Sequence, residues 1–213
     1  MFQEYKAQLN FKKFEKPWLL IQVCCAPDLI VPLQRLKEYF KLYLYWYNPN
    51  IQPYSEYQKR YKEYIKLLNL EKWDYEIIED KYENREFYKK LFENRKIVGI
   101  ENDDYKSLMK EFSQMEEKNS LRCDICYYTR LLEPAKIAKK LWIKYFTTTL
   151  LISPKKSVEK LDKYGQLVTE QTWVQYLSFD FRKNDWFNLA AKYTKENNIW
   201  RQNYCGCAWS IRN

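Results

Sequence analysis

The chain has 213 residues, of which 46% are hydrophobic and 18% aromatic, so it can bury a core and is not a disordered protein. Its 37 basic and 28 acidic residues give a formal net charge of +9, which fits a polyanionic partner and equally a solvated, lysine-rich surface. Histidine is absent, which excludes Ser-His-Asp and Cys-His nucleophilic catalysis and every metal site with imidazole ligands.

The N-terminal residues 1–17 lack the apolar core of a signal peptide. No apolar run in the sequence approaches the roughly 20 residues that cross a bilayer. We therefore expect a cytoplasmic protein with no membrane partner, in a compartment where clustered cysteines bind metals or take part in catalysis. Residues 1–17 are expected to form an N-terminal extension, either a basic arm or a cap on the sheet.

In the first half of the chain, apolar runs alternate with amphipathic stretches. The run WLLIQV predicts a buried strand over 18–23, and apolar residues at helical spacing predict a helix over 29–40. A second strand is predicted over 42–47 and is followed by the loop NPNIQP, whose two prolines end it. A helix over 55–70 and a third strand over 75–78 come next.

The second half continues the alternation of helices and strands. The charged segment 83–120 is helical in pattern, and a helix is predicted over 123–141, where Pro134 should kink the helix or start a new one. The remaining predicted elements are a strand over 145–151, a helix capped by Ser157, a strand over 176–179 and a helix over 186–197. This order predicts one α/β domain over residues 1–213, with a mostly parallel sheet flanked by helices.

The loops that follow the predicted strands carry the chemically distinctive residues. They contain Cys24 and Cys25, the NPNIQP segment, the segment FTTTLLISP and the segment SFDFRKND. In an open α/β sheet, ligands bind outside the carboxyl ends of the strands. We therefore expect these loops to gather at one edge of the sheet and to form the functional site there.

The six cysteines fall into three pairs that are close in sequence, which are Cys24-Cys25, Cys123-x-x-Cys126 and Cys205-x-Cys207. A Cys-x-x-Cys at the start of a helix places both thiols on one face, within reach of one metal or cluster. Four thiolates are the usual complement of a zinc ion or an iron–sulfur cluster. Six exceed one such site, which suggests a second metal or an exchangeable dithiol, and Asp28 is the carboxylate nearest to Cys25.

The adjacent pair Cys24-Cys25 leaves several interpretations open. Neighbouring strand residues point to opposite faces, so the two thiols fill a core poorly and need not bind the same metal. A disulfide between adjacent cysteines is strained and rare. A structural zinc site explains four thiols and leaves two idle, and a dithiol oxidoreductase that uses Cys123 and Cys126 leaves four unexplained.

Two further segments carry candidate substrate contacts. Thr147, Thr148 and Thr149 lie in a predicted buried strand. If these threonines lie at the end of the strand, their hydroxyls can reach a phosphate or a cluster sulfur. Lys155 and Lys156 precede a predicted helix N-terminus and can form a phosphate cradle there. A solvated helix face is the simpler interpretation of the two lysines.

Six segments in chain order, spanning residues 19 to 210, resemble the epoxyqueuosine reductase QueH family: VCCAPD, LYWYNPNIQP, RCDICYYTRL, FTTTLLISPKK, FDFRKND and WRQNYCGCAWS. The resemblance implies a single Rossmann-like (HUP/PP-loop-like) domain with the metal site at the carboxyl ends of the strands. It also implies a cytoplasmic oxidoreductase with redox-active cysteines that reduces epoxyqueuosine to queuosine at the wobble position of tRNA. This is the last step of queuosine biosynthesis, and no cobalamin is implied. The alternative is a zinc-stabilised RNA-binding protein without redox activity.

The resemblance further implies a 4Fe-4S cluster and a second iron ion. The implied metal residues are Cys24, Cys25, Cys123, Cys126, Cys205 and Cys207, with Asp28 as an oxygen ligand, and their division between the two metals stays open. The implied partners are a tRNA carrying epoxyqueuosine and an unidentified electron donor. Without histidine, protons must come from other groups, and the residues in the matching motifs that we consider are Tyr47, Asp180, Arg182 and Tyr204.

The sequence departs from the family pattern where many relatives have histidine. These positions hold Gln22, Gln52 and Lys155 here, which speaks against a mechanism that needs a histidine acid. Pro134 interrupts a motif that is usually helical, and Trp186 stands where a glycine is usual. All six thiols are unaffected.

Overall fold

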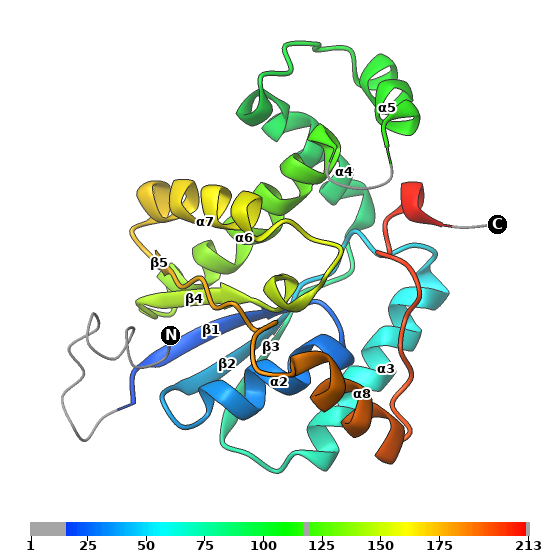
Figure 1. The fold of residues 1–213 in the computed structure, drawn as a ribbon. Helices are drawn as coiled ribbons and strands as arrows, with labels where there is room; N and C mark the ends of the chain where they lie inside the picture. Colours follow the sequence, from blue (N-terminus) through cyan, green and yellow to red (C-terminus); the bar gives the residue numbers. More distant parts are fainter. Residues whose placement is uncertain (1–15, 117–119, 212–213) are drawn as a thin grey trace.

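The computed structural model describes residues 16–116 and 120–211, and at its centre lies a five-stranded, all-parallel sheet (Figure 1). The strands are β1 (Trp18–Val23), β2 (Lys41–Trp46), β3 (Tyr75–Glu79), β4 (Tyr145–Thr148) and β5 (Gln175–Tyr176). Their spatial order is β3-β2-β1-β4-β5. The predicted α/β class and parallel sheet are confirmed, whereas the predicted extension lies, up to residue 15, outside the described residues.

Helices cover both faces of the sheet. They are α2 (Ala26–Leu36), α3 (Tyr54–Leu70), α4 (Asn84–Glu93), α5 (Tyr105–Gln114), α6 (Leu121–Lys140), α7 (Val158–Thr172) and α8 (Trp186–Glu196), with short 3₁₀ turns η1 (Asn94–Val98), η2 (Thr149–Ile152) and η3 (Ala208–Ser210). Helices α2, α3 and α8 lie on one face, and α6 and α7 lie on the other with α4 beside them (Figure 1). Within the described ranges, no helix combines the length and apolar character that a membrane span needs.

The burial of the central strand β1 explains why helices cover both faces of the sheet. Leu19, Leu20, Ile21 and Val23 are all fully buried, so both faces of this strand need a helical layer. A continuous apolar run of this kind is typical of a parallel sheet buried on both sides. Strand β3 is largely exposed instead, as expected for a strand at the edge of the sheet.

The sheet order places a topological switch point between β1 and β4. The chain builds outward from β1 to β2 and β3, then returns to the other side of β1 to form β4 and β5. Loops diverge at such a point and leave a crevice outside the carboxyl ends of the two central strands. Cys24 directly follows β1 and Thr149 directly follows β4, and the Cys24 amide donates to Thr149 Oγ1 at 2.9 Å.

Several predicted boundaries were wrong in the first half of the chain. Helix α2 begins at Ala26 and ends at Leu36, whereas the prediction was 29–40, because Pro27 fits the first helical turn, where its missing amide costs nothing. The segment predicted as helical over 83–120 contains, in its described part up to residue 116, two helices and a 3₁₀ turn. Gly99, with φ of 78°, ends that turn in the left-handed conformation.

The second half also differs from the prediction in detail. Pro134 lies inside one continuous helix, so no new segment starts there. Strand β4 ends at Thr148 because the Thr148 side chain accepts a hydrogen bond from the Leu150 amide and turns the chain into η2. Strand β5 covers Gln175–Tyr176 and not 176–179, as it pairs only with the short β4. The predicted cap is confirmed, since Ser157 accepts from the Lys160 amide.

Replacing Gly165 by Ala is expected to lower the free energy of unfolding by about 1–3 kcal/mol, the usual cost of overpacking. Gly165 lies in α7 against the ring of Tyr176, and an added Cβ would stand 2.2 Å from Tyr176 Cδ1. Chemical denaturation measures the change. The control Gln166→Ala, at the next and exposed position, should stay within about 0.5 kcal/mol of the parent. A gain in stability for Gly165→Ala would show that the helix and strand are not in close contact.

Candidate metal centre

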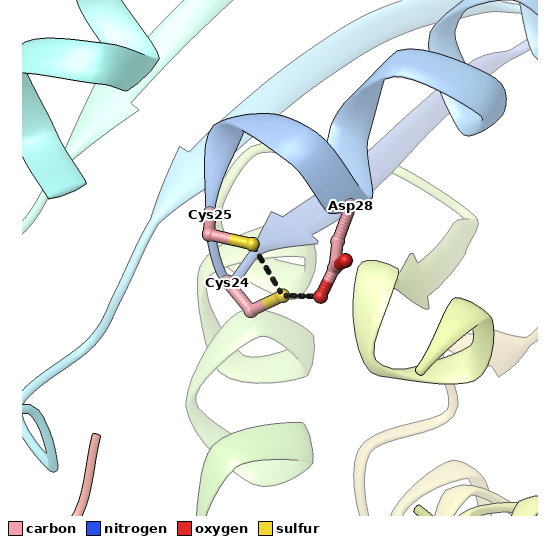
Figure 2. A group of neighbouring side chains, drawn as sticks. All are labelled: Cys24, Cys25 and Asp28. Carbon is pink, nitrogen blue, oxygen red and sulfur yellow. Dashed lines mark hydrogen bonds between the residues drawn. The ribbon is translucent and has the colours of Figure 1, made fainter. Parts of the chain in front are cut away.

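Cys24, Cys25 and Asp28 form a compact group at the carboxyl end of β1, which we call the triad. Cys24 Sγ lies 3.7 Å from Cys25 Sγ and 3.1 Å from Asp28 Oδ2. The ligand atoms of all three residues lie within 4.8 Å of one another. Figure 2 shows the three side chains pointing toward one another from the end of β1 and the first turn of α2.

The triad corrects the expectation that the two adjacent thiols point to opposite faces. The strand ends at Val23, and Cys25 is the N-cap of α2, so the alternation of a strand no longer applies. Both cysteines are free thiols and do not form a disulfide. Cys24 and Cys25 therefore face one common point and can bind the same ion.

Because the triad is buried, negative charge on its side chains is energetically unfavourable unless a cation compensates it. Burial raises the pKa of Cys25 well above the usual value, and it raises the pKa of Asp28 although the Cys24 and Cys25 thiols hydrogen-bond to the carboxylate. A bound cation would remove this cost of ionisation. Two sulfur donors and one oxygen donor suit a transition metal such as iron or zinc, so the triad fits a single metal ion.

The other four cysteines come together as a second cluster, which we call the four-cysteine group. Cys123 and Cys126 lie in the first turns of α6, and Cys205 and Cys207 lie in the C-terminal segment after α8. Cys126 interacts electrostatically with Cys123 and Cys205, and Cys207 interacts with Cys126. Four thiols are the ligand number of an iron–sulfur cluster or a tetrahedral zinc site.

The loop that carries Cys205 and Cys207 is shaped by a glycine and clamped by an arginine. Gly206 has φ of 107°, and an added Cβ would lie 3.0 Å from Arg60 Nη1. The Arg60 guanidinium, from α3, donates to the carbonyls of Tyr204 and Cys205, both at 3.1 Å. The conformation of this loop therefore depends on a helix far away in the sequence.

Charge is unevenly distributed within the four-cysteine group. A hydrogen bond from Cys207 lowers the pKa of Cys205 well below the usual value, and the nearby ammonium of Lys156 lowers it further. Lys156 Nζ lies 2.8 Å from Cys205 Sγ. Burial raises the pKa of Cys126 to about 11. Cys205 is thus prepared as a thiolate, the form that binds metals.

A cavity of about 230 Å³ connects the two groups. Cys24 and Asp28 of the triad and Cys205 of the four-cysteine group all line it. Five cationic side chains also line the cavity: Arg60, Arg130, Lys155, Lys156 and Arg201. The cavity therefore borders both cysteine groups and has a positively charged lining.

The predicted proton-transfer residues lie in different places. Tyr204 lines the cavity, and its hydroxyl donates to the Gln52 carbonyl. Tyr47 is buried and stacks on Tyr45 with ring centroids 5.6 Å apart. Asp180 and Arg182 form an ion pair of 3.3 Å with each other. Of these four residues only Tyr204 is among those that line the cavity.

The predicted substrate contacts separate into two sets. Lys155 and Lys156 line the cavity. Thr147, Thr148 and Thr149 are fully buried, and none of them is among the lining residues. Their hydroxyls bond to the Leu177 carbonyl, the Gln22 side chain and the Cys24 amide, respectively. The threonines thus stabilise the structure around the site through hydrogen bonds, and Thr149 does so by fixing the backbone of Cys24.

Several residues of the site were not singled out from the sequence, among them Gln202, Arg130 and Arg60. Gln202 Nε2 donates to Cys25 Sγ at 2.8 Å and joins the C-terminal segment to the triad. Arg130 lies one helical turn after Cys126, a spacing that was visible in the sequence. Arg60 carries no local signal, because its partners Tyr204 and Cys205 are distant in the chain.

Replacing Gly206 by Ala is expected to reduce metal binding by the four-cysteine group about tenfold, since strain of this kind costs roughly 1–3 kcal/mol. The added methyl group would press on Arg60 and Ile51. Metal content per chain measures the effect. The control is Gly99→Ala, at a glycine with φ of 78° and no atom within 4 Å of the added Cβ. Equal metal loss in both variants would contradict a specific role for Gly206.

Comparisons with known proteins agree on one family. The family model described as "Epoxyqueuosine reductase QueH" matches residues 19–213, a range that contains both cysteine groups. The chain is 32% identical over 193 residues to the epoxyqueuosine reductase QueH of Thermotoga maritima, covering 91% of this chain and 90% of the relative. It is 31% identical over 199 residues to that of Staphylococcus epidermidis, covering 92% and 77%. The relative from Dehalococcoides mccartyi is 29% identical over 195 residues, with 91% and 92% covered.

Proposed function

This chain belongs to the epoxyqueuosine reductase QueH family, and we propose that its reaction takes place in the cavity between the triad and the four-cysteine group. The protein is an oxidoreductase that carries out the last step of queuosine biosynthesis in tRNA. The observation that carries the proposal is the shared cavity, which is lined by residues of both groups. A substrate bound there lies beside both groups.

The two groups suit two different metal centres. The four-cysteine group holds a 4Fe-4S cluster, because it supplies four thiols and draws them from two segments. The triad holds a single second iron ion, because its ligand atoms all lie within 4.8 Å of one another. Cys24 and Asp28 reach the cavity, so an ion held by the triad can meet the substrate.

The reaction removes the epoxide oxygen as water and needs two electrons and two protons. When bound, the metals would supply the electrons and a Lewis acid for the epoxide oxygen. The chain itself binds the substrate and provides protons. Tyr204 is the proton donor that we favour, because it lines the cavity and its phenol is protonated at neutral pH. A separate electron donor completes the system.

The tRNA binds through its phosphates to the cationic wall of the cavity, where Lys155 and Arg201 are exposed. The wobble base is splayed into the cavity, and the aromatic side chains Trp186 and Phe187 in its wall offer surfaces for stacking. Phe187 is 52% exposed and Arg201 lies over its ring at 5.5 Å. The exposed part of this wall thus combines charge with an aromatic surface.

The affinity for tRNA is expected to fall steeply with salt. If about three cavity cations contact phosphates, the logarithm of the binding constant should fall with a slope of roughly −2 to −3 against the logarithm of the salt concentration. Fluorescence anisotropy with labelled tRNA measures the slope. Lys155→Met should reduce its magnitude by about one unit. A flat salt response of the parent protein would contradict phosphate-based binding.

Anaerobic purification tests the metal assignment and distinguishes the competing functions. A brown protein that contains iron and sulfide supports the cluster. A colourless protein that holds only zinc after anaerobic reconstitution supports the zinc-stabilised RNA-binding alternative. The activity test incubates the reduced protein with tRNA from a strain that lacks the last queuosine step and measures queuosine by nucleoside mass spectrometry. Conversion by metal-free protein would favour the dithiol oxidoreductase.

A further inference from the structure

Lys156 is a cation whose nearest anionic partner is a cysteine. Its Nζ lies 2.8 Å from Cys205 Sγ and 5.8 Å from the centroid of the Tyr127 ring. Within residues 16–116 and 120–211, Lys156 forms no ion pair with a carboxylate. The ammonium is therefore held against a thiol that binds metal and not against an ordinary acidic partner.

Arg130 is a second cation of the same kind. It is 3% exposed, its Nη2 donates to Asn48 Oδ1 at 2.8 Å, and its Nε has no hydrogen-bond partner among the residues that the structure describes. It interacts electrostatically with Cys126 and Cys205. It too makes no ion pair with a carboxylate in the described part of the chain. Two cations thus act on the same four-cysteine group.

The cost of removing charge from water explains why these two cations lie beside the four-cysteine group. Arg130 is buried and Lys156 is half-buried, and a cation withdrawn from water without an anionic partner is costly, so nearby thiolates stabilise both side chains. Four thiolates around an iron–sulfur cluster leave the whole assembly negative, and each added electron makes it more negative. A fixed positive charge beside a ligand sulfur therefore stabilises the reduced state more than the oxidised state. The charge and hydrogen bonds around the sulfurs are established determinants of cluster potential.

We propose that Lys156 is a positioning residue that raises the reduction potential of the cluster held by the four-cysteine group, with Arg130 acting in the same direction. The inference rests on the proposed function in one respect, namely that this group holds a redox-active cluster. The inference assigns a specific role to a side chain that coordinates no metal, and this role does not depend on contact with the substrate. By this means the cluster accepts electrons from a weaker donor than it otherwise could.

The test compares the holoenzyme with the variants Lys156→Met and Lys156→Arg. Anaerobic redox titration, followed by electron paramagnetic resonance, gives the midpoint potential, and iron and sulfide analysis gives the cluster content. Lys156→Met should shift the potential to more negative values with the cluster retained. Lys156→Arg keeps the charge and should remain near the parent value. The control is Lys155→Met, because Lys155 lines the same cavity and is exposed, and the neighbouring Lys156 makes the contact with Cys205.

Two outcomes overturn the inference. One is an unchanged potential in Lys156→Met with a full cluster, and the other is an equal shift in Lys155→Met. If Lys156→Met fails to load the cluster, Arg130→Gln decides the question, since a negative shift supports the inference and an unchanged potential overturns it. A parent protein without iron and sulfide would instead overturn the proposed function, so the two failures are distinguishable.

Discussion

Replacing Asp28 by Asn is expected to abolish epoxyqueuosine reduction while leaving the visible absorbance of the cluster in place. Asp28 Oδ2 lies 3.1 Å from Cys24 Sγ, so the change removes the charged oxygen ligand of the triad. Metal-ion catalysis contributes several kcal/mol, which corresponds to a loss of at least about 100-fold in rate. Queuosine formation under single-turnover conditions measures the rate, and iron analysis should show the loss of one ion per chain.

The matched control for this prediction is Asp103→Asn. It makes the same chemical change at an exposed loop position outside the cavity, so it should retain the activity and the iron content of the parent. Full activity in Asp28→Asn would show that the carboxylate ligand of the triad is dispensable. Loss of visible absorbance in Asp28→Asn would show instead that the triad belongs to the cluster.

Replacing Cys126 by Ser is expected to abolish both the activity and the colour of the protein. Cys126 is central to the four-cysteine group, because it interacts with Cys123, Cys205 and Cys207. Loss of one of four thiolate ligands removes the cluster and with it the electron supply, so iron and sulfide should fall by most of their parent content. Absorbance spectroscopy and metal analysis after anaerobic purification measure this result.

The counterpart variant is Cys24→Ser, which tests the division of the six cysteines. Cys24 belongs to the triad and lines the cavity, so this variant should lose activity and keep the colour. The two variants remove the same atom from the same residue type, which makes them a matched pair. Bleaching by Cys24→Ser together with retained colour in Cys126→Ser would reverse our assignment of the two groups.

Two of the three positions at which the family resemblance implies histidine, Gln22 and Gln52, have structural roles here. Gln22 is fully buried, and its Nε2 donates to the Tyr47 and Val23 carbonyls. Gln52 Nε2 donates to Asn84 Oδ1 and Tyr88 Oη. Both glutamines thus join neighbouring segments at the carboxyl edge of the sheet. Lys155 alone of the three substituted positions lines the cavity, where it adds positive charge.

Element order was predictable because its causes are local. The apolar run of β1 and the helical spacing in α3 are visible in short windows of the sequence. Boundaries were less predictable, because side chains decide them in three dimensions. Thr148 ends β4 by bonding to the Leu150 amide, and β5 is short because its partner β4 is short. Neither effect leaves a trace in the hydrophobic pattern.

The candidate site was predictable as a set of residues but not as an arrangement. All six cysteines and Asp28 were evident from their types and spacing. The three threonines were expected in a buried strand, and the sequence left their contact with a substrate open, since a buried hydroxyl and a substrate-facing hydroxyl have the same sequence signal. Their bonds to Leu177, Gln22 and Cys24 are visible only in the folded chain.

The sequence by itself determined the α/β class, the chemistry of sulfur ligands and the exclusion of histidine, because these follow from composition and local spacing. The tertiary structure alone decided that Cys24 and Cys25 share one site with Asp28 and that Cys123 and Cys126 meet Cys205 and Cys207. The physical reason is the sheet order, which brings β1 and β4 together and gathers distant loops at one edge. Contacts such as Arg60 with Cys205 and Lys156 with Cys205 arise only after that gathering.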